Sequence, residues 1–117
     1  LAAALRPGDV IALSGDLGAG KTCLARGVLH GLGFAGDVPS PTFGLVIPYA
    51  SPAVALPVWH VDLYRLETPG EADALALDEA LVDGVLLIEW PQRLDWLWPQ
   101  TLHLRLTPEG PRRRLTV

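Results

Sequence analysis

The stretch that decides the fold of this chain is VIALSGDLGAGKT, at residues 10–22. Its first part, residues 10–14, is a short apolar run that predicts a buried strand. Residues 15–22 match the pattern G-x-x-x-x-G-K-S/T, whose glycines let backbone N–H groups turn inward around an anion. Residues 21–31 follow with apolar side chains at helical spacing, and Gly31 and Gly33 are stop signals. The stretch therefore predicts a strand, a phosphate-binding loop and a helix, in this order.

The residue types of this loop fit a nucleoside triphosphate with magnesium. The helix that begins near Lys21 points the positive end of its dipole at the anion. In loops of this pattern the lysine, here Lys21, reaches the β- and γ-phosphates, and the next hydroxyl, here that of Thr22, ligates Mg²⁺. We expect nine residues to line the nucleotide: Gly15, Asp16, Leu17, Gly18, Ala19, Gly20, Lys21, Thr22 and Cys23.

The absence of a guanine-binding motif indicates which base the nucleotide carries. P-loop proteins that bind GTP read guanine with the motif N-K-x-D. This sequence contains no Asn, and its only lysine, Lys21, already belongs to the loop. We therefore expect ATP, with Mg²⁺, as the cofactor pair.

The rest of the chain alternates between strand and helix patterns. Strands are expected at residues 43–49, 58–63 and 85–89, and a C-terminal hairpin at residues 102–106 and 113–117 around a turn at 108–111. A capping box at residues 68–71 predicts a helix, or two short ones, as far as about Val82, with Gly84 as its end. Strands interleaved with helices predict an α/β fold of the P-loop NTPase type, with a mixed, largely parallel sheet flanked by helices.

Length and composition limit the organisation of the chain. Its 117 residues fit one domain, residues 1–117, and half of them are hydrophobic, which is enough for a core. The first residue is Leu and a strand follows almost at once, so we expect the natural N-terminal segment to be missing. One cysteine and no signal peptide favour the cytoplasm, and no apolar run approaches the roughly 18 residues that span a bilayer.

The charge of the chain argues against tight binding of nucleic acid by this chain alone. The net charge is −4, and the only basic run is Arg112–Arg114 near the end. Proteins that grip nucleic acid themselves carry a basic face. A role on RNA would therefore be indirect.

Two carboxylates are candidates for the metal and for hydrolysis. Glu89 ends the apolar strand at 85–89, where a P-loop enzyme places a metal carboxylate. Asp62 lies within the strand at 58–63 and shares a face with His60, because side chains alternate along a strand. The alternatives are a solvated strand end for Glu89, a structural salt bridge for Asp62 and a core histidine for His60.

Several segments together are similar to one family. They are GDLGAGKT at residues 15–22 with LARG at 24–27, SPTF at 40–43 followed by LV at 45–46 and Tyr49, HVDLYRL at 60–66, and IEWP at 88–91. In this order and over nearly the whole chain, they resemble the TsaE family, formerly YjeE. These are bacterial ATPases required for threonylcarbamoyladenosine modification of tRNA. The loop alone is common to many families, whereas the combination is specific.

The resemblance implies roles for individual residues. It implies Thr22 and Glu89 as magnesium ligands, Asp62 together with Lys21 as the residues of hydrolysis, and TsaD and TsaB as partner proteins. Ser40 and Thr42 lie in a loop that resembles a nucleotide-sensing segment, and His60 and Trp90, in the matching motifs beside the site, are further candidates for nucleotide sensing. Two departures are visible: Cys23 stands where the family usually has a second Thr, and the family's N-terminal segment is largely absent.

Two other functions remain open from the sequence. A small-molecule kinase would share the loop, but 117 residues leave little room for a substrate domain and an arginine-bearing lid. A nucleotide-dependent binding module without hydrolysis would share the whole pattern. Transfer to an acceptor would identify the first, and absence of turnover with and without partners the second.

Overall fold

The computed structural model describes most of the chain, namely residues 4–15, 21–38, 46–50, 52–68, 76–94, 97–109 and 112–116. Within these ranges the side chains of residues 22, 107–109 and 112–116 are not part of the description.

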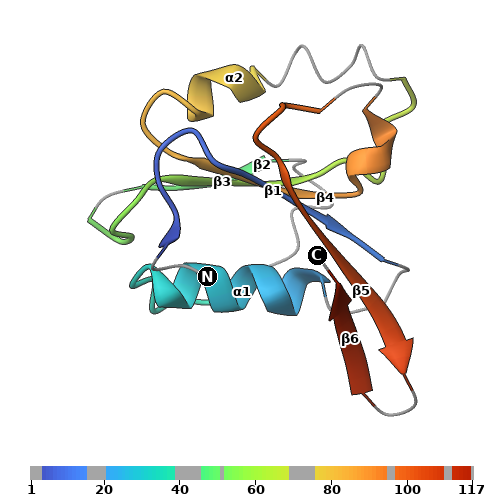
Figure 1. Ribbon diagram of the computed structural model, residues 1–117. Helices are drawn as coiled ribbons and strands as arrows, with labels where there is room; N and C mark the ends of the chain where they lie inside the picture. Colours follow the sequence, from blue (N-terminus) through green and yellow to red (C-terminus); the bar gives the residue numbers. More distant parts are fainter. Residues whose placement is uncertain are drawn as a thin grey trace.

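A six-stranded sheet in the order β2-β3-β4-β1-β5-β6 forms the centre of the molecule (Figure 1). Its strands are β1 (Val10–Ser14), β2 (Val46–Tyr49), β3 (Val58–Asp62), β4 (Val85–Glu89), β5 (Leu102–Glu109) and β6 (Arg112–Thr116). The four inner strands β3, β4, β1 and β5 are parallel, and the edge strands β2 and β6 are antiparallel to their neighbours. Pro48 lies in β2, where the edge position tolerates a residue without an N–H group.

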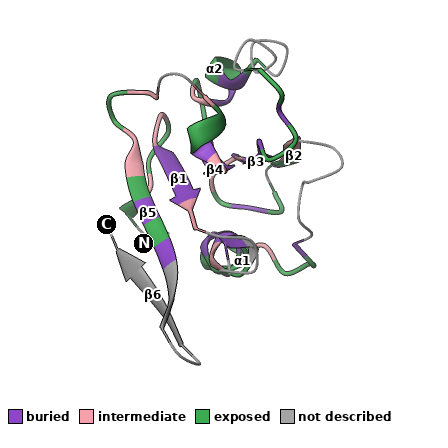
Figure 2. Cartoon of the chain, turned by 90° about the vertical axis from the view of Figure 1, so that its right-hand side faces the viewer, coloured by how far each residue is buried: buried purple, intermediate pink, exposed green. Residues whose placement is uncertain are grey.

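The two central strands are buried along their whole length because helices cover both faces of the sheet. All five residues of β4 and the first four of β1 are buried (Figure 2). Helix α1 (Lys21–Gly31) lies on one face and the short helix α2 (Leu77–Ala80) on the other (Figure 1). Near-continuous apolar runs such as VLLIE are typical of parallel strands covered in this way.

Two apolar clusters follow from the alternation of side chains along the strands. Ile11, Leu13 and Leu87 pack with Leu29 of α1 in the first cluster. Leu86 and Ile88 point the other way and pack with Leu77 of α2 in the second. The face to which a strand residue belongs can therefore be read from its position, which matters for the site below.

The predicted fold class is confirmed: the sheet is mixed, largely parallel and flanked by helices, and a β5–β6 hairpin lies at its C-terminal edge. The predicted strands at residues 10–14 and 85–89 and the helix at 21–31 have the predicted bounds. The strand predicted at 58–63 ends at Asp62, although the N–H of Leu63 still donates to the carbonyl of Glu89 at 3.1 Å.

Two local predictions need correction. The prediction from residue 68 to about Val82 is one helix or two short ones, and a single helix is wrong because Ala76 has a left-handed backbone (φ 51°, ψ 45°). The described helix α2 begins at Leu77 and ends at Ala80, short of Val82, and residues 69–75 lie outside the described part of the chain. The hairpin turn predicted at 108–111 is also too long. Pro108 and Glu109 pair with Arg113 and Arg112 in the ladder, so they belong to β5. Pro108 lies beyond the part of β5 that pairs with β1, where a missing N–H costs no bond to that strand.

Among the residues that the structure describes, no helix is long and apolar enough to cross a membrane.

Candidate functional site

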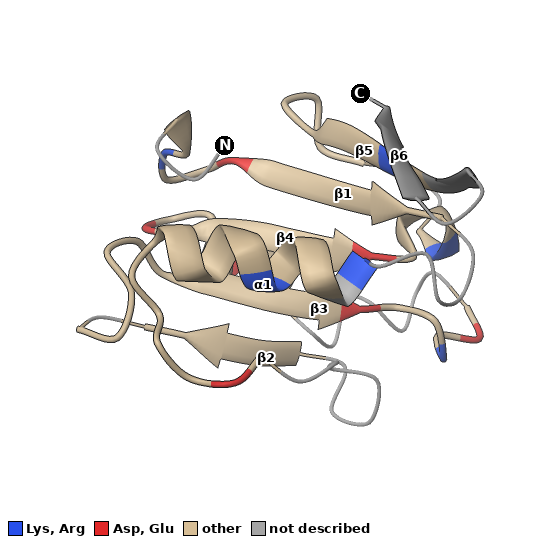
Figure 3. Cartoon of the chain, turned by 90° about the horizontal axis from the view of Figure 1, so that it is seen from below, with Lys and Arg blue, Asp and Glu red and all other residues tan. Residues whose placement is uncertain are grey.

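The candidate site lies at the carboxyl ends of three parallel strands. β1 ends at Ser14 and leads through residues 15–20 to Lys21, the first residue of α1. β3 and β4 end at Asp62 and Glu89, which are paired across the ladder. Figure 3 shows the acidic ends of β3 and β4 beside the basic first turn of α1. In open α/β sheets ligands bind at this edge, outside the carboxyl ends of the strands.

Both carboxylates are buried on the face of the sheet that α1 covers. Glu89 shares a face with Leu87, two residues earlier, which packs in the α1 cluster. Asp62 shares a face in the same way with Val58 of that cluster. Glu89 is 3% exposed and Asp62 4% exposed, so the alternative of a solvated strand end is wrong for Glu89. A buried carboxylate is costly unless it is paired or bound to a metal.

Lys21 closes the loop from the helix side. Its Nζ atom donates to the carbonyl of Gly15 at 2.7 Å and lies 4.3 Å from the centre of the Trp90 ring. Gly15 has φ 144°, a backbone region that residues with a side chain rarely adopt. The ammonium group thus lies between the carbonyl oxygen of Gly15 and the face of the Trp90 ring.

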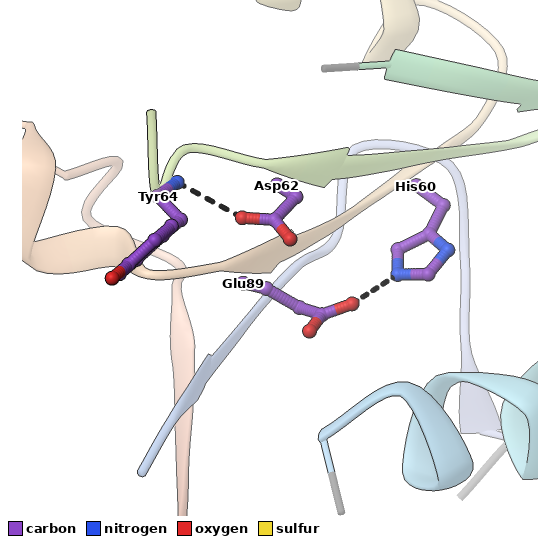
Figure 4. Close-up of polar contacts among 4 residues, drawn as sticks. All are labelled: His60, Asp62, Tyr64 and Glu89. Atoms are coloured by element: carbon purple, nitrogen blue, oxygen red, sulfur yellow. Dashed lines mark hydrogen bonds and ion pairs between the residues drawn. The ribbon is translucent and has the colours of Figure 1, made fainter. Parts of the chain in front are cut away.

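Hydrogen bonds of His60 and Asp62 can be followed at this edge (Figure 4). Nε2 of His60 lies 2.6 Å from Oε2 of Glu89, and both side chains are buried. Oδ1 of Asp62 accepts from the backbone N–H of Tyr64 at 2.9 Å, which fixes the turn after β3. His60 therefore contacts a predicted metal ligand directly.

Trp90 occupies an unusual backbone position directly after β4. It has φ 62° and ψ 51°, a left-handed conformation that costs a residue other than glycine roughly 1–2 kcal/mol. The centre of its ring lies 4.9 Å from the centre of the Tyr64 ring. The guanidinium carbon of Arg93 lies 5.7 Å from the centre of the same Tyr64 ring. The 3-10 helix η3 (Pro91–Arg93), which begins after Trp90, brings Arg93 to this place.

The structure thus brings together Gly15, Lys21, His60, Asp62, Glu89 and Trp90, all of which were predicted from the sequence. Sequence reasoning did not assign Tyr64 and Arg93 to the site. Tyr64 stands in the H-V-D-L-Y-R motif, but Arg93 carries no motif signal because the 3-10 helix was not expected. Cys23 is exposed in the first turn of α1.

Several predicted residues lie outside the part of the chain that the structure describes. They are Asp16, Leu17, Gly18, Ala19 and Gly20 of the loop, together with Ser40 and Thr42. The backbone of Thr22 belongs to α1, but its side chain is not described. The roles assigned to these residues stay predictions.

The donor set at this edge fits magnesium. Mg²⁺ prefers oxygen ligands and is held by one or two carboxylates together with phosphate oxygens and water. Two buried carboxylates on neighbouring strands beside the first turn of α1 supply this kind of ligand. In the described ranges no group of three or more His, Cys, Asp or Glu forms a complete metal cage, and magnesium with a nucleotide does not need one.

Comparisons with known proteins agree on one family. Residues 1–115 match the family model of the threonylcarbamoyl adenosine biosynthesis protein TsaE. A tRNA threonylcarbamoyladenosine biosynthesis protein TsaE from Streptomyces coelicolor is 44% identical over 108 residues, which are 91% of this chain and 73% of that protein. The protein of the same name from Bacillus subtilis is 44% identical over 100 residues, 85% of this chain and 61% of that protein.

A solved structure gives the same answer for the fold. The crystal structure of YdiB from Bacillus subtilis superposes with a TM-score of 0.76 and 35% sequence identity, over 97% of this chain and 69% of that one. Family model, relatives and structure agree over most of the sequence, so the chain belongs to the TsaE family.

Proposed function

We propose that this chain is a magnesium-dependent ATP-binding protein and slow ATPase that supports threonylcarbamoyladenosine modification of tRNA. The observation that carries the proposal is the position of Lys21 at the start of α1, with Asp62 and Glu89 buried on the same face at adjacent strand ends. The names of the relatives, which are tRNA threonylcarbamoyladenosine biosynthesis proteins, support the pathway. A phosphate-binding loop followed by a helix supports the nucleotide.

The residues divide the work according to their positions. Lys21 binds the β- and γ-phosphates, and the hydroxyl of Thr22 and the carboxylate of Glu89 hold Mg²⁺ directly or through water. Bound magnesium neutralises charge that develops on the phosphates. Asp62, whose Oδ1 is already fixed by the N–H of Tyr64, orients the attacking water or a water in the metal's outer shell.

The proposed partners are the proteins TsaD and TsaB, and tRNA is reached only through them. The acidic charge of −4 fits a helper that acts on proteins. Turnover by the chain alone should be slow, because the sequence offers no obvious arginine finger and the one candidate is Arg65, in the segment that carries Asp62. Arginine fingers supplied by a partner raise rates by about 10³ to 10⁵.

Calorimetric titration with a non-hydrolysable ATP analogue and Mg²⁺ tests nucleotide binding. Lys21→Ala removes a charge-assisted contact to phosphate and should weaken binding about 10- to 100-fold. Arg26→Ala, which removes an exposed cation from the same helix, is the matched control and should bind like the unaltered chain. Equal affinity of the two variants for the analogue would contradict the assignment of residues 15–22 as the phosphate-binding loop. A GTP analogue should compete poorly, and competition equal to that of ATP would refute the adenine preference.

Phosphate release measured with and without TsaD and TsaB tests hydrolysis. Asp62→Asn should leave analogue binding largely intact and lower turnover by about 100-fold or more. Glu89→Gln should weaken the magnesium-dependent part of binding, because a neutral amide is a poor ligand for a hard cation. Fast turnover by the chain alone, or transfer of phosphate to a small acceptor, would contradict the proposal.

A further inference from the structure

His60 lies in the middle of β3, fully buried, yet it makes a polar contact to only one side. Its Nε2 atom is 2.6 Å from Oε2 of Glu89, while Nδ1 is buried without a hydrogen-bond partner in the described part of the chain. A half-satisfied imidazole in an apolar layer is costly. The contact to Glu89 is therefore the feature that explains a histidine at this position.

The unpartnered Nδ1 atom indicates how the hydrogen bond is built. Were Glu89 the donor, the neutral ring would carry its proton on Nδ1, and a charged ring would carry one there as well. Either form buries an N–H group without an acceptor, and orphaned donors are rarer in proteins than unused acceptors. The arrangement that avoids this is a neutral His60 whose Nε2–H donates to the carboxylate of Glu89. This tautomer is assigned from the hydrogen-bond pattern.

The hydrogen bond also sets the direction of the Glu89 side chain. Glu89 is paired in the ladder with Asp62, but its carboxylate is bonded to His60, two residues earlier on β3. Figure 4 shows the Glu89 carboxylate turned toward His60, while the Asp62 carboxylate is bonded to the N–H of Tyr64. The bond thus holds Oε2 of Glu89 toward His60, whereas Oδ1 of Asp62 faces the turn after β3.

We propose that His60 is a positioning residue that orients the Glu89 carboxylate for a divalent cation bound with the nucleotide. The inference rests on the proposed function, since it takes Glu89 as a magnesium ligand. His60 does not touch the metal or the nucleotide. Loss of an outer-shell partner of this kind lowers metal affinity about 10- to 100-fold.

The test separates metal binding from nucleotide binding. Binding of a fluorescent, non-hydrolysable ATP analogue is measured in EDTA and then as a function of Mg²⁺ concentration. His60→Leu replaces the ring by an apolar side chain, and His60→Gln keeps an N–H donor at similar reach. His103→Leu makes the same change at an exposed histidine of β5 and is the control. Thermal unfolding of each variant checks the fold.

The proposal expects His60→Leu to require about 10- to 100-fold more Mg²⁺ for half-saturation, with unchanged affinity in EDTA. His60→Gln and His103→Leu should stay close to the unaltered chain. If His60→Leu does not fold, His60→Asn replaces it, since its shorter amide cannot reach Glu89 and should show the same loss.

Three results would overturn the inference. The first is a normal magnesium requirement in His60→Leu while Glu89→Gln shows a raised one, which leaves the proposed function standing. The second is an equal loss of analogue binding in EDTA and in Mg²⁺, which marks a merely structural residue. The third is a His60→Gln variant that folds but requires as much Mg²⁺ as His60→Leu. If the unaltered chain binds the analogue without any dependence on Mg²⁺, the proposed function itself fails.

Discussion

Tyr49 illustrates at the residue scale how burial can leave a polar group uncompensated. It is the last residue of the edge strand β2, it is 7% exposed, and its ring packs edge-on against Phe34 at 4.8 Å. Its hydroxyl is buried and has no hydrogen-bond partner in the described part of the chain. Burial raises the pKa of Tyr49 above its usual value of 10.0, because the phenolate would be desolvated.

The raised pKa of Tyr49 predicts a loss of stability in alkali. When the pKa is higher in the folded state, the unfolded chain releases the proton first, so the free energy of unfolding falls as the pH rises from about 10 through the folded pKa. Tyr49→Phe should remove this part of the fall. At neutral pH it should leave the free energy of unfolding unchanged or raise it by about 1 kcal/mol, because an unsatisfied hydroxyl is deleted.

Urea unfolding at neutral pH and above pH ~10 measures both effects of Tyr49→Phe. Tyr64→Phe is the control, because Tyr64 is 37% exposed and its ring keeps its contact with Trp90 after the change. An alkaline loss in Tyr49→Phe as steep as in the unaltered chain would show that other groups cause it.

At the scale of the element, the sequence predicted what strong local signals encode. The bounds of β1, α1 and β4 could be predicted because an apolar run, a glycine-rich loop and a helical repeat each leave a local pattern. The late start of α2 and the 3-10 helix could not be predicted. Each follows a residue with a left-handed backbone, Ala76 or Trp90, and neither residue type is typical of that conformation.

The positions of the candidate site residues could be predicted from the sequence, but the contacts between their side chains could not. Asp62, Glu89 and Lys21 could be placed at one edge because the carboxyl ends of parallel strands meet there. The contact between His60 and Glu89 could not, since it depends on the register between β3 and β4, which no local pattern sets. Side-chain alternation gave the shared face of His60 and Asp62 but not the partner that each would find.

The junction of α2 with β4 offers a sharper test of packing, because Gly84 leaves no room for a side chain. A Cβ atom at Gly84 would lie 2.5 Å from the carbonyl oxygen of Pro57, just before β3. The same carbonyl accepts the N–H of Val85 at 2.9 Å, so it cannot move without losing a bond of the sheet. Gly84→Ala should therefore lower the free energy of unfolding by about 1–3 kcal/mol.

Gly27 provides the matched control for Gly84. It lies on the exposed side of α1, and a Cβ atom there would have nothing within 4 Å. Gly27→Ala should raise the free energy of unfolding by about 0.5–1 kcal/mol, because alanine loses less backbone freedom in a helix. The denaturant midpoints of both variants measure these changes in stability. A Gly84→Ala midpoint equal to or above that of the unaltered chain would show that the strands adjust to the added methyl group.

At the scale of the whole molecule, few basic residues lie outside the candidate site. The chain has 13 acidic and 9 basic residues, and the only lysine, Lys21, is 5% exposed at the start of α1. Three of the eight arginines follow one another in β6, at the edge of the sheet, and the side chains there are not described. Few cations therefore remain to form a continuous basic surface, which RNA binding requires.

This balance predicts that the chain alone binds tRNA weakly at physiological salt. Each phosphate that a protein neutralises releases counterions, so affinity grows with the number of basic contacts and falls steeply with salt. With a net charge of −4, we expect binding no tighter than the non-specific range of about 10⁻⁴ to 10⁻⁶ M. Fluorescence anisotropy with labelled tRNA at several salt concentrations measures both the affinity and the salt slope.

The basic run in β6 is the place where this prediction could fail. Replacing Arg112, Arg113 and Arg114 by Ala removes three of the nine basic residues and raises the net negative charge from 4 to 7. If these arginines make the residual contacts to RNA, the variant should lose its weak RNA binding. The slope of log affinity against log salt concentration should then become shallower by about three. Tight tRNA binding by the unaltered chain that disappears in this variant would overturn the indirect role and make β6 an RNA-binding edge. Weak binding in both, with normal modification of tRNA once the proposed partners TsaD and TsaB are added, is the outcome that we expect if those proteins supply the contacts to RNA.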